Sequence, residues 1–193
     1  MVGHRAIAAA DLYGFMEILS GIGGYGARCL EFLIVTASRS GEARLATWSE
    51  IDSETNTWNI PGNRMKSGRP HRVPLSGGVL KLLEALPRIE GEDLIFPGAR
   101  LSDMSMTQVM RDMGVNAVPH GFRATFSSWC ASSTAYPSEV REMALPHAIG
   151  NDTVGAYQRS DLFDKRRNLM ADWAKFINTA QAKGKVFPMH KAA

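Results

Sequence analysis

Apolar residues recur every three or four positions through most of this sequence, and that spacing constrains the fold more than any other feature. The longest such stripe runs from about residue 161 to residue 181 and contains Leu162, Phe163, Leu169, Met170, Trp173, Phe176, Ile177 and Ala180. Shorter helical segments are predicted at 11–18, 30–37, 40–48, 76–86, 105–113, 122–130, 137–144 and 151–157. Side chains at this spacing share one face of an α-helix, and that face has to be buried. The sequence therefore predicts a mainly helical fold.

Only a small part of the chain has the character of a β-sheet. Residues 57–61 and 72–75 resemble two short strands joined by a basic, glycine-containing loop, and 94–96 is a candidate third strand. The predicted class is therefore mainly α with a small antiparallel β-sheet (α+β).

Length and composition are those of one ordinary domain. The chain has 193 residues, of which 45% are hydrophobic and 21% charged, and it contains no repeat and no low-complexity linker. No apolar run is long enough for a membrane helix, and the start of the chain lacks the pattern of a secretory signal. The two cysteines, Cys29 and Cys130, make no disulfide framework. We expect one domain spanning 1–193 in the cytoplasm.

The positive charge is concentrated in two places. The net charge is +3, yet residues 62–74 contain four Lys and Arg residues and no acid, and residues 173–193 contain four lysines and no acid. Segments of one charge sign are typical of nucleic-acid contacts, although many are only solvated surface. Arg64, Arg69 and Arg72 are therefore candidates for contacts with nucleic-acid phosphates, and we expect 179–193 to form a basic tail.

The sequence argues against several common functional motifs. The stretch 21–26 matches G-x-G-x-x-G, but a predicted helix precedes it where a dinucleotide-binding motif needs a strand. The five histidines show no H-E-x-x-H or other metal-ligand spacing, and the sequence has no G-x-S-x-G elbow. We therefore expect no metal and no cofactor.

A set of basic and phenolic residues remains, each at a predicted helix end or in a turn. The set comprises Arg39, Lys66, His120, Arg123, His147 and Tyr157. Two arginines can bind the non-bridging oxygens of a phosphodiester and stabilise a pentacoordinate transition state. A tyrosine can attack the phosphorus, while lysine and histidine side chains transfer protons. Singly, each residue has an ordinary structural explanation; together they suit phosphoryl transfer at a phosphodiester.

The order and context of these residues resemble the catalytic domain of tyrosine recombinases, specifically the prophage-type integrases. The matching blocks are LIVTASRSGE at 33–42, WSEID at 48–52, WNIP at 58–61, RMK at 64–66, HRVPLS at 71–76, HGFR at 120–123, ALPH at 144–147, AYQR at 156–159 and RRNLM at 166–170. The similarity spans about 28–178.

This resemblance implies a role for each matching residue. Arg39 and Arg123 would bind the phosphate, and Lys66 would be the general acid for the 5′-hydroxyl leaving group. His120 would be the acid/base residue, and His147 would donate a hydrogen bond to the scissile phosphate. Tyr157 would form a 3′-phosphotyrosyl link, and Glu42 would support Arg39 from behind.

The resemblance also implies site-specific recombination in phage or prophage integration and excision. Its partners would be double-stranded DNA attachment sites and other protomers, four in the family's assemblies, with an excision factor as a further candidate partner. The N-terminal DNA-binding domains of the family are absent from these 193 residues. Two alternatives stay open: DNA relaxation of the type IB topoisomerase kind, and a DNA-binding module that does not cleave.

Overall fold

The computed structural model describes residues 5–97, 101–102, 104–145 and 161–180. Its helices of a full turn or more are α1 (Leu12–Gly21), α2 (Tyr25–Thr36), α3 (Ser40–Arg44), α4 (Gly77–Glu84), α5 (Ser105–Asp112), α6 (Gly121–Ser133), α7 (Ser138–Ala144) and α9 (Phe163–Ile177). Three short 3-10 turns accompany them, η1 (Ala9–Asp11), η2 (Trp48–Glu50) and η3 (Gly62–Arg64). The mainly helical prediction is confirmed, whereas the helix expected at 151–157 lies outside the described residues.

Most predicted helices appear within a few residues of their expected ends. The first runs three residues past Ile18, and the last is shorter than expected at both ends, because Leu162 takes a left-handed conformation (φ 51°) and α9 starts after it. The glycine stretch at 21–26 forms the turn between α1 and α2, with no strand before it. The helix predicted at 105–113 begins at Ser105 and ends at Asp112.

The small sheet has three antiparallel strands in the order β1 (Ile51–Asp52), β2 (Thr57–Ile60) and β3 (His71–Pro74). The prediction that 94–96 is the third strand is wrong. Leu94 makes a single isolated bridge to Thr47, and Ile95 and Phe96 are fully buried instead. The third strand is β1, whose two residues are too few to show an alternating pattern.

Two groups of aromatic side chains form much of the core. Phe126, Trp129, Trp173 and Phe176 pack together where α6 meets α9, with ring centroids 5.0 to 6.1 Å apart. Phe32 packs against Trp58 of β2 and against Phe96. The indole of Trp173 also donates a hydrogen bond to the Ile34 carbonyl at 2.9 Å. Helix α2 therefore links the helical half of the core to the sheet.

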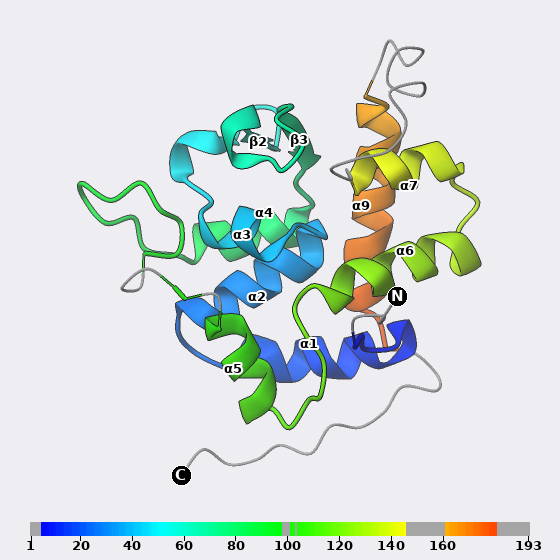
Figure 1. The fold of residues 1–193 in the computed structure, drawn as a ribbon, viewed down its shortest axis with the longest axis horizontal. Helices are drawn as coiled ribbons and strands as arrows, with labels where there is room; N and C mark the ends of the chain where they lie inside the picture. Colours follow the sequence, from blue (N-terminus) through cyan, green and yellow to red (C-terminus); the bar gives the residue numbers. More distant parts are fainter. Residues whose placement is uncertain (1–4, 98–100, 103, 146–160, 181–193) are drawn as a thin grey trace.

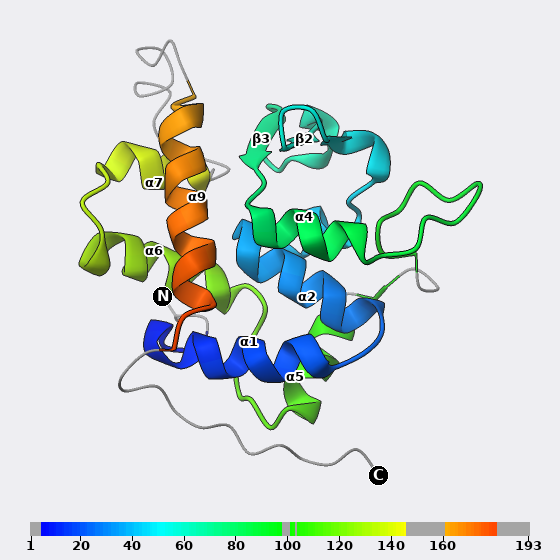
Figure 2. The same ribbon diagram turned by 180° about the vertical axis from the view of Figure 1, so that it is seen from behind.

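Helix α9 stands between two parts of the molecule. Figures 1 and 2 show it beside α6 and α7 on one side, with its first turns near the sheet and its last turns near α1. The N-terminal end of α9 therefore lies next to β3, and this neighbourhood holds several of the charged residues discussed below.

No helix in the described part of the chain is both long enough and apolar enough to cross a membrane.

Candidate functional site

Arg39 lies in the turn between α2 and α3. The turn begins with Ala37 in the left-handed conformation (φ 51°, ψ 27°), after which the chain extends and Arg39 takes the N-cap position of α3. The buried carboxylate of Glu42 accepts a hydrogen bond from the Arg39 backbone N–H at 2.8 Å and one from its guanidinium at 2.6 Å. Glu42 therefore fixes both the backbone and the side chain of Arg39 in this turn.

Arg123 lies in the first turn of α6 and is only 6% exposed. Its Nη1 donates a hydrogen bond to the Ala37 carbonyl at 2.6 Å, which joins α6 to the turn that carries Arg39. Its Nη2 is buried and has no hydrogen-bond partner among the described residues. A buried guanidinium nitrogen without a partner is costly, and it marks a place where a ligand oxygen could bind.

The charges around Arg123 do not balance locally. Burial lowers the pKa of Arg123 to about 10, and the positive charge of Arg39 lowers it further, while Glu42 acts in the opposite direction. Arg39 already shares Glu42 in a salt bridge. Two guanidinium groups thus face one carboxylate, and an anion between them would relieve the repulsion.

His120 is the residue before α6, and its exposed side chain lies one turn before Arg123. Its backbone carbonyl accepts a hydrogen bond from the Arg123 N–H at 3.2 Å. The glycine between them is required by packing, because a Cβ at Gly121 would lie 2.3 Å from the Arg5 carbonyl oxygen. The HGFR block therefore brings an exposed imidazole and a buried guanidinium into one helical turn.

Lys66 is exposed in the loop between β2 and β3. The buried side chain of Met65 anchors the loop on one side, and Gly68 turns the chain with φ 71° on the other. The loop closes tightly, since a Cβ at Gly62 would lie 2.4 Å from the Gly68 carbonyl oxygen. The ammonium group is therefore carried on a compact loop that projects from the sheet.

Arg64, one of the three expected DNA contacts, is engaged by other residues of the chain. Arg64 forms a salt bridge with Glu50 and donates a hydrogen bond to the Glu42 carbonyl at 2.6 Å. Its guanidinium is already used inside the molecule and does not face solvent as a phosphate contact would. Arg69 is exposed as expected.

Arg72 is half-exposed but is held by an acid. It forms a salt bridge with Asp161 at 2.7 Å, and its guanidinium lies 4.3 Å from the centre of the Phe163 ring. Any contact between Arg72 and DNA would therefore compete with this pairing.

The positive charges of Arg39 and Arg123 act on His71, and the sequence did not indicate that these residues lie close together. Burial lowers its pKa to about 3, and the positive charges of Arg166, Arg123 and Arg39 act in the same direction against Asp161. The imidazole is therefore neutral at physiological pH. Its place as the first residue of β3, just after a basic loop, was visible in the sequence, but its burial was not.

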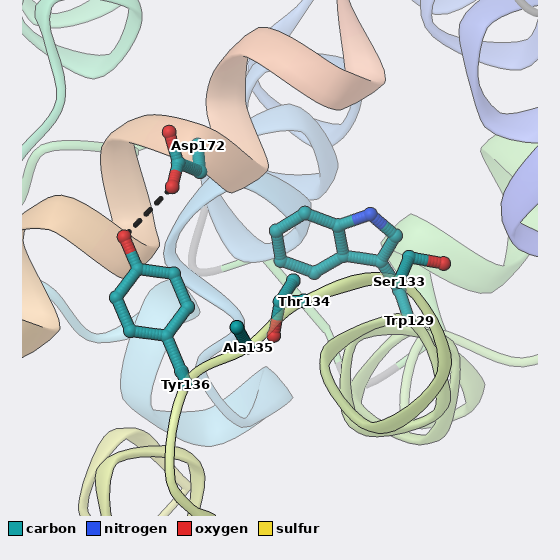
Figure 3. Close-up of a pocket in the computed structure, with 6 residues that line it drawn as sticks. All are labelled: Trp129, Ser133, Thr134, Ala135, Tyr136 and Asp172. Carbon is teal, nitrogen blue, oxygen red and sulfur yellow. Dashed lines mark hydrogen bonds between the residues drawn. The ribbon is translucent and has the colours of Figure 1, made fainter.

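Two predicted residues, His147 and Tyr157, lie outside the described residues. Two of the other three tyrosines are engaged by carboxylates. The Tyr136 hydroxyl donates to Asp172 at 2.7 Å beside a pocket between α6 and α9, which Figure 3 shows, and burial together with this bond raises its pKa to about 12. Tyr13 donates to Glu17, which raises its pKa too. Neither phenol is activated as a nucleophile.

Metal-type clusters are not found in the described part of the chain, where no three His, Cys, Asp or Glu side chains gather as a metal site would require. The groups that the structure brings together are the cations Arg39 and Arg123, with His120 one turn before Arg123. Such an arrangement can bind a phosphate group and stabilise the negative charge of a phosphoryl transition state.

Known proteins of one kind match the chain. A family model described as the phage integrase family matches residues 8–162. Prophage integrase IntA of Escherichia coli (strain K12) is 37% identical over 168 residues, covering 80% of this chain and 40% of the relative. Prophage integrase IntZ of the same strain is 31% identical, with 93% and 47% covered, and the integrase of Enterobacteria phage P4 is 30% identical, with 85% and 44% covered. No solved structure matches. The chain spans less than half the length of these relatives. The match to the family model over most of its length shows that the chain belongs to the phage integrase family.

Proposed function

We propose that this chain cleaves and rejoins DNA through a covalent 3′-phosphotyrosyl intermediate on Tyr157, in site-specific recombination between attachment sites. The observation that carries the proposal is the buried Arg123 guanidinium, which has one nitrogen without a partner among the described residues and lies within electrostatic reach of Arg39. A phosphodiester is the anion that the family's DNA substrate would supply.

The tether of Arg123 suits this role. The Ala37 carbonyl that orients the guanidinium is neutral, so it fixes the direction of the side chain without cancelling its charge. A carboxylate in the same place would have held Arg123 equally well but would have repelled phosphate. Arg39 has such a carboxylate in Glu42, so the two arginines and this one carboxylate together keep one positive charge for the ligand.

The reaction then needs one bond exchange at phosphorus. The Tyr157 oxygen forms a bond to phosphorus, the bond from phosphorus to the 5′ oxygen breaks, and the two arginines stabilise the charge on the non-bridging oxygens. Lys66 donates its proton to the departing 5′ oxygen, and His120 accepts the phenolic proton. His147 donates a hydrogen bond to the phosphate. Attack by a 5′-hydroxyl from a partner strand reverses these steps and releases Tyr157.

Tyr157 is assigned as the nucleophile because its AYQR block resembles the family's nucleophile motif, and two of the other tyrosines are poorly suited to the role. Tyr136 and Tyr13 each donate to a carboxylate, which stabilises the neutral phenol. A phenol held in this way is a poorer nucleophile than one beside cations.

The same proposal implies the partners of the protein and its place in the cell. The partners would be double-stranded DNA attachment sites, further protomers of a tetramer and an excision factor, with the protein acting at the bacterial nucleoid. Because the matched relatives are more than twice as long as the aligned chain, parts of the DNA recognition are expected outside these 193 residues.

A nicked suicide duplex carrying the attachment site tests the proposal. A covalent protein–DNA adduct should form and should disappear in Tyr157→Phe, while the matched variant Tyr136→Phe should keep it. An adduct that survives in Tyr157→Phe would contradict the nucleophile assignment. Equal adduct formation on unrelated duplexes would instead favour topoisomerase-like relaxation, and binding with no adduct in any variant would favour a non-cleaving module.

A further inference from the structure

We infer that Asp161 is a positioning residue for the nucleophile, acting through an ion-pair cluster with Arg72 and Arg166 that we call the latch. The inference rests on the proposed function, because it concerns how Tyr157 is held. Asp161 lies four residues after Tyr157 in the sequence, and it is described in the structure although Tyr157 is not.

The latch is tightly connected. One oxygen of Asp161, Oδ2, accepts hydrogen bonds from Nε and Nη2 of Arg72 at 2.9 and 2.7 Å and from Nη2 of Arg166 at 2.9 Å. Arg166 also donates from Nε to the Asp161 carbonyl at 2.7 Å and from Nη1 to the Arg72 carbonyl at 2.6 Å. Every nitrogen of the Arg166 guanidinium thus has an oxygen partner, and those oxygens belong to Asp161 and Arg72.

The ring of Phe163, the first residue of α9, packs against the same cluster. The Phe163 ring lies 4.3 Å from the guanidinium carbon of Arg72, 5.4 Å from that of Arg166 and 4.9 Å from that of Arg167. Arg167 reaches the turn between β1 and β2, where it donates to the Thr55 carbonyl at 3.0 Å. The start of α9 is therefore fixed to two parts of the sheet.

The latch connects two segments that the proposed reaction needs. Arg72 lies in β3, six residues after Lys66, and Asp161 lies just before α9, four residues after Tyr157. Three intervening residues restrict Tyr157 to within about 14 Å of Asp161. By fixing Asp161 to β3, the latch fixes one end of the nucleophile's segment to the strand that also carries His71.

The burial of Arg166 makes the carboxylate of Asp161 hard to replace. Arg166 is 1% exposed, so its charge depends on a nearby counter-ion. Burial raises the pKa of Asp161, but the hydrogen bond from Arg72 and the charge of Arg166 outweigh it and lower the pKa below its ordinary value. Asparagine at 161 would keep the side chain's size but leave Arg72 and Arg166 without a negative charge.

The experiment compares single-turnover cleavage with DNA affinity in the full 193-residue chain. Asp161→Asn should slow adduct formation about 10- to 100-fold while changing the Kd for the duplex less than about threefold. Asp161→Glu should recover part of the rate because it restores the charge. The matched control is Asp164→Asn, which removes an exposed acid three residues later, in the first turn of α9, and should cleave normally.

A duplex with a 5′-bridging sulfur separates positioning of the nucleophile from loss of the general acid. Sulfur leaves without protonation, so it should restore much of the rate in Lys66→Ala but little in Asp161→Asn. Full rescue of Asp161→Asn would overturn the inference, as would a normal rate on ordinary DNA. A rate loss that only matches a loss of folded protein, measured by circular dichroism at the assay temperature, would overturn it as well.

The inference and the proposed function can fail separately. If Tyr157→Phe still forms the adduct, the proposed function fails whatever Asp161→Asn does. If Tyr157→Phe abolishes the adduct and Asp161→Asn behaves like Asp164→Asn, only the role of the latch is wrong.

Discussion

Two clusters of arginines lie in this molecule, and they treat a buried guanidinium in opposite ways. In the latch, all three nitrogens of Arg166 donate to oxygens, and a carboxylate balances the charge. Around Arg123, one nitrogen donates to a neutral carbonyl and another has no partner among the described residues. The contrast shows that burial of an arginine does not reveal its role. The partners of Arg166 are complete within the molecule, whereas Arg123 keeps a buried donor for the phosphate that we propose it binds.

Replacing Arg123 or Arg166 by methionine should separate the two roles, and the largest effect should be on the cleavage rate of the Arg123 variant. Arg123→Met should lower the single-turnover rate of adduct formation about 10²- to 10³-fold, the usual cost of removing one donor to a transition-state oxyanion. Its urea midpoint should stay the same or rise, because a poorly compensated buried charge is removed. A large fall in the midpoint would mean that Arg123 is mainly structural. Inorganic phosphate gives a second check, since it should raise the Tm of the native chain more than that of the variant.

Arg166→Met should have the opposite effect on stability. Removing one member of a buried ion pair costs about 3 kcal/mol, and less here because Asp161 is partly exposed and keeps Arg72 as a partner. Urea unfolding followed by circular dichroism measures the difference from the native chain. Equal stability of the two chains would show that Met fills the site as well as the latch does.

The neutral His71 imidazole, which feels charges from both clusters, should make stability depend on pH. Its pKa is about 3 in the folded chain and near 6.5 when unfolded, so the unfolded state binds the extra proton as the pH falls. Stability is therefore complete above about pH 6.5 and decreases toward pH 3, by at most about 1.4 kcal/mol per pH unit. Between pH 7 and pH 5, His71→Gln should lose less free energy of unfolding than the native chain. Parallel losses in the two chains would assign the dependence to other groups.

The smallest expected effect is on the salt dependence of DNA binding, which should differ between Arg69, whose side chain is exposed, and the less exposed Arg64. Arg69→Gln should weaken binding to any duplex about equally and reduce the slope of log K against log salt by about one. Arg64→Gln should leave that slope unchanged, because its guanidinium pairs with Glu50 and the Glu42 carbonyl, and should lower stability instead. A reduced slope in Arg64→Gln would show that it contacts phosphate after all.

Much of the fold could be predicted because most helices carry a long apolar stripe. The last stripe predicted α9 to within four residues at each end, and the basic loop placed β2 and β3. The third strand could not be predicted, since β1 has two residues and pairs only through the register Ile51 with Trp58 and Asp52 with Thr57. The prediction of a strand at 94–96 was wrong because a short, buried apolar run has the same sequence pattern in a strand and in an irregular segment.

The site could be predicted in its residue types but not in its pairing. Arg39 and Arg123 were visible from their motifs, whereas Arg64 looked like an exposed cation because its partner Glu50 lies 14 residues away in the sequence. The bond from Arg166 to the Arg72 carbonyl spans 94 residues, and the burial of His71 depends on the same packing. Such contacts follow from tertiary structure, which local patterns do not encode.

The close approach at Gly121 also has a practical consequence for handling the protein. The Arg5 carbonyl accepts a hydrogen bond from Val118 at 3.1 Å, and the Ile7 carbonyl accepts one from Thr125 at 2.6 Å, so the first described residues bracket the turn that holds Arg123. Tension on the chain at residue 5 would act directly on these bonds. A surface attachment at that end therefore needs a long, slack linker, so that no tension reaches the turn that holds Arg123.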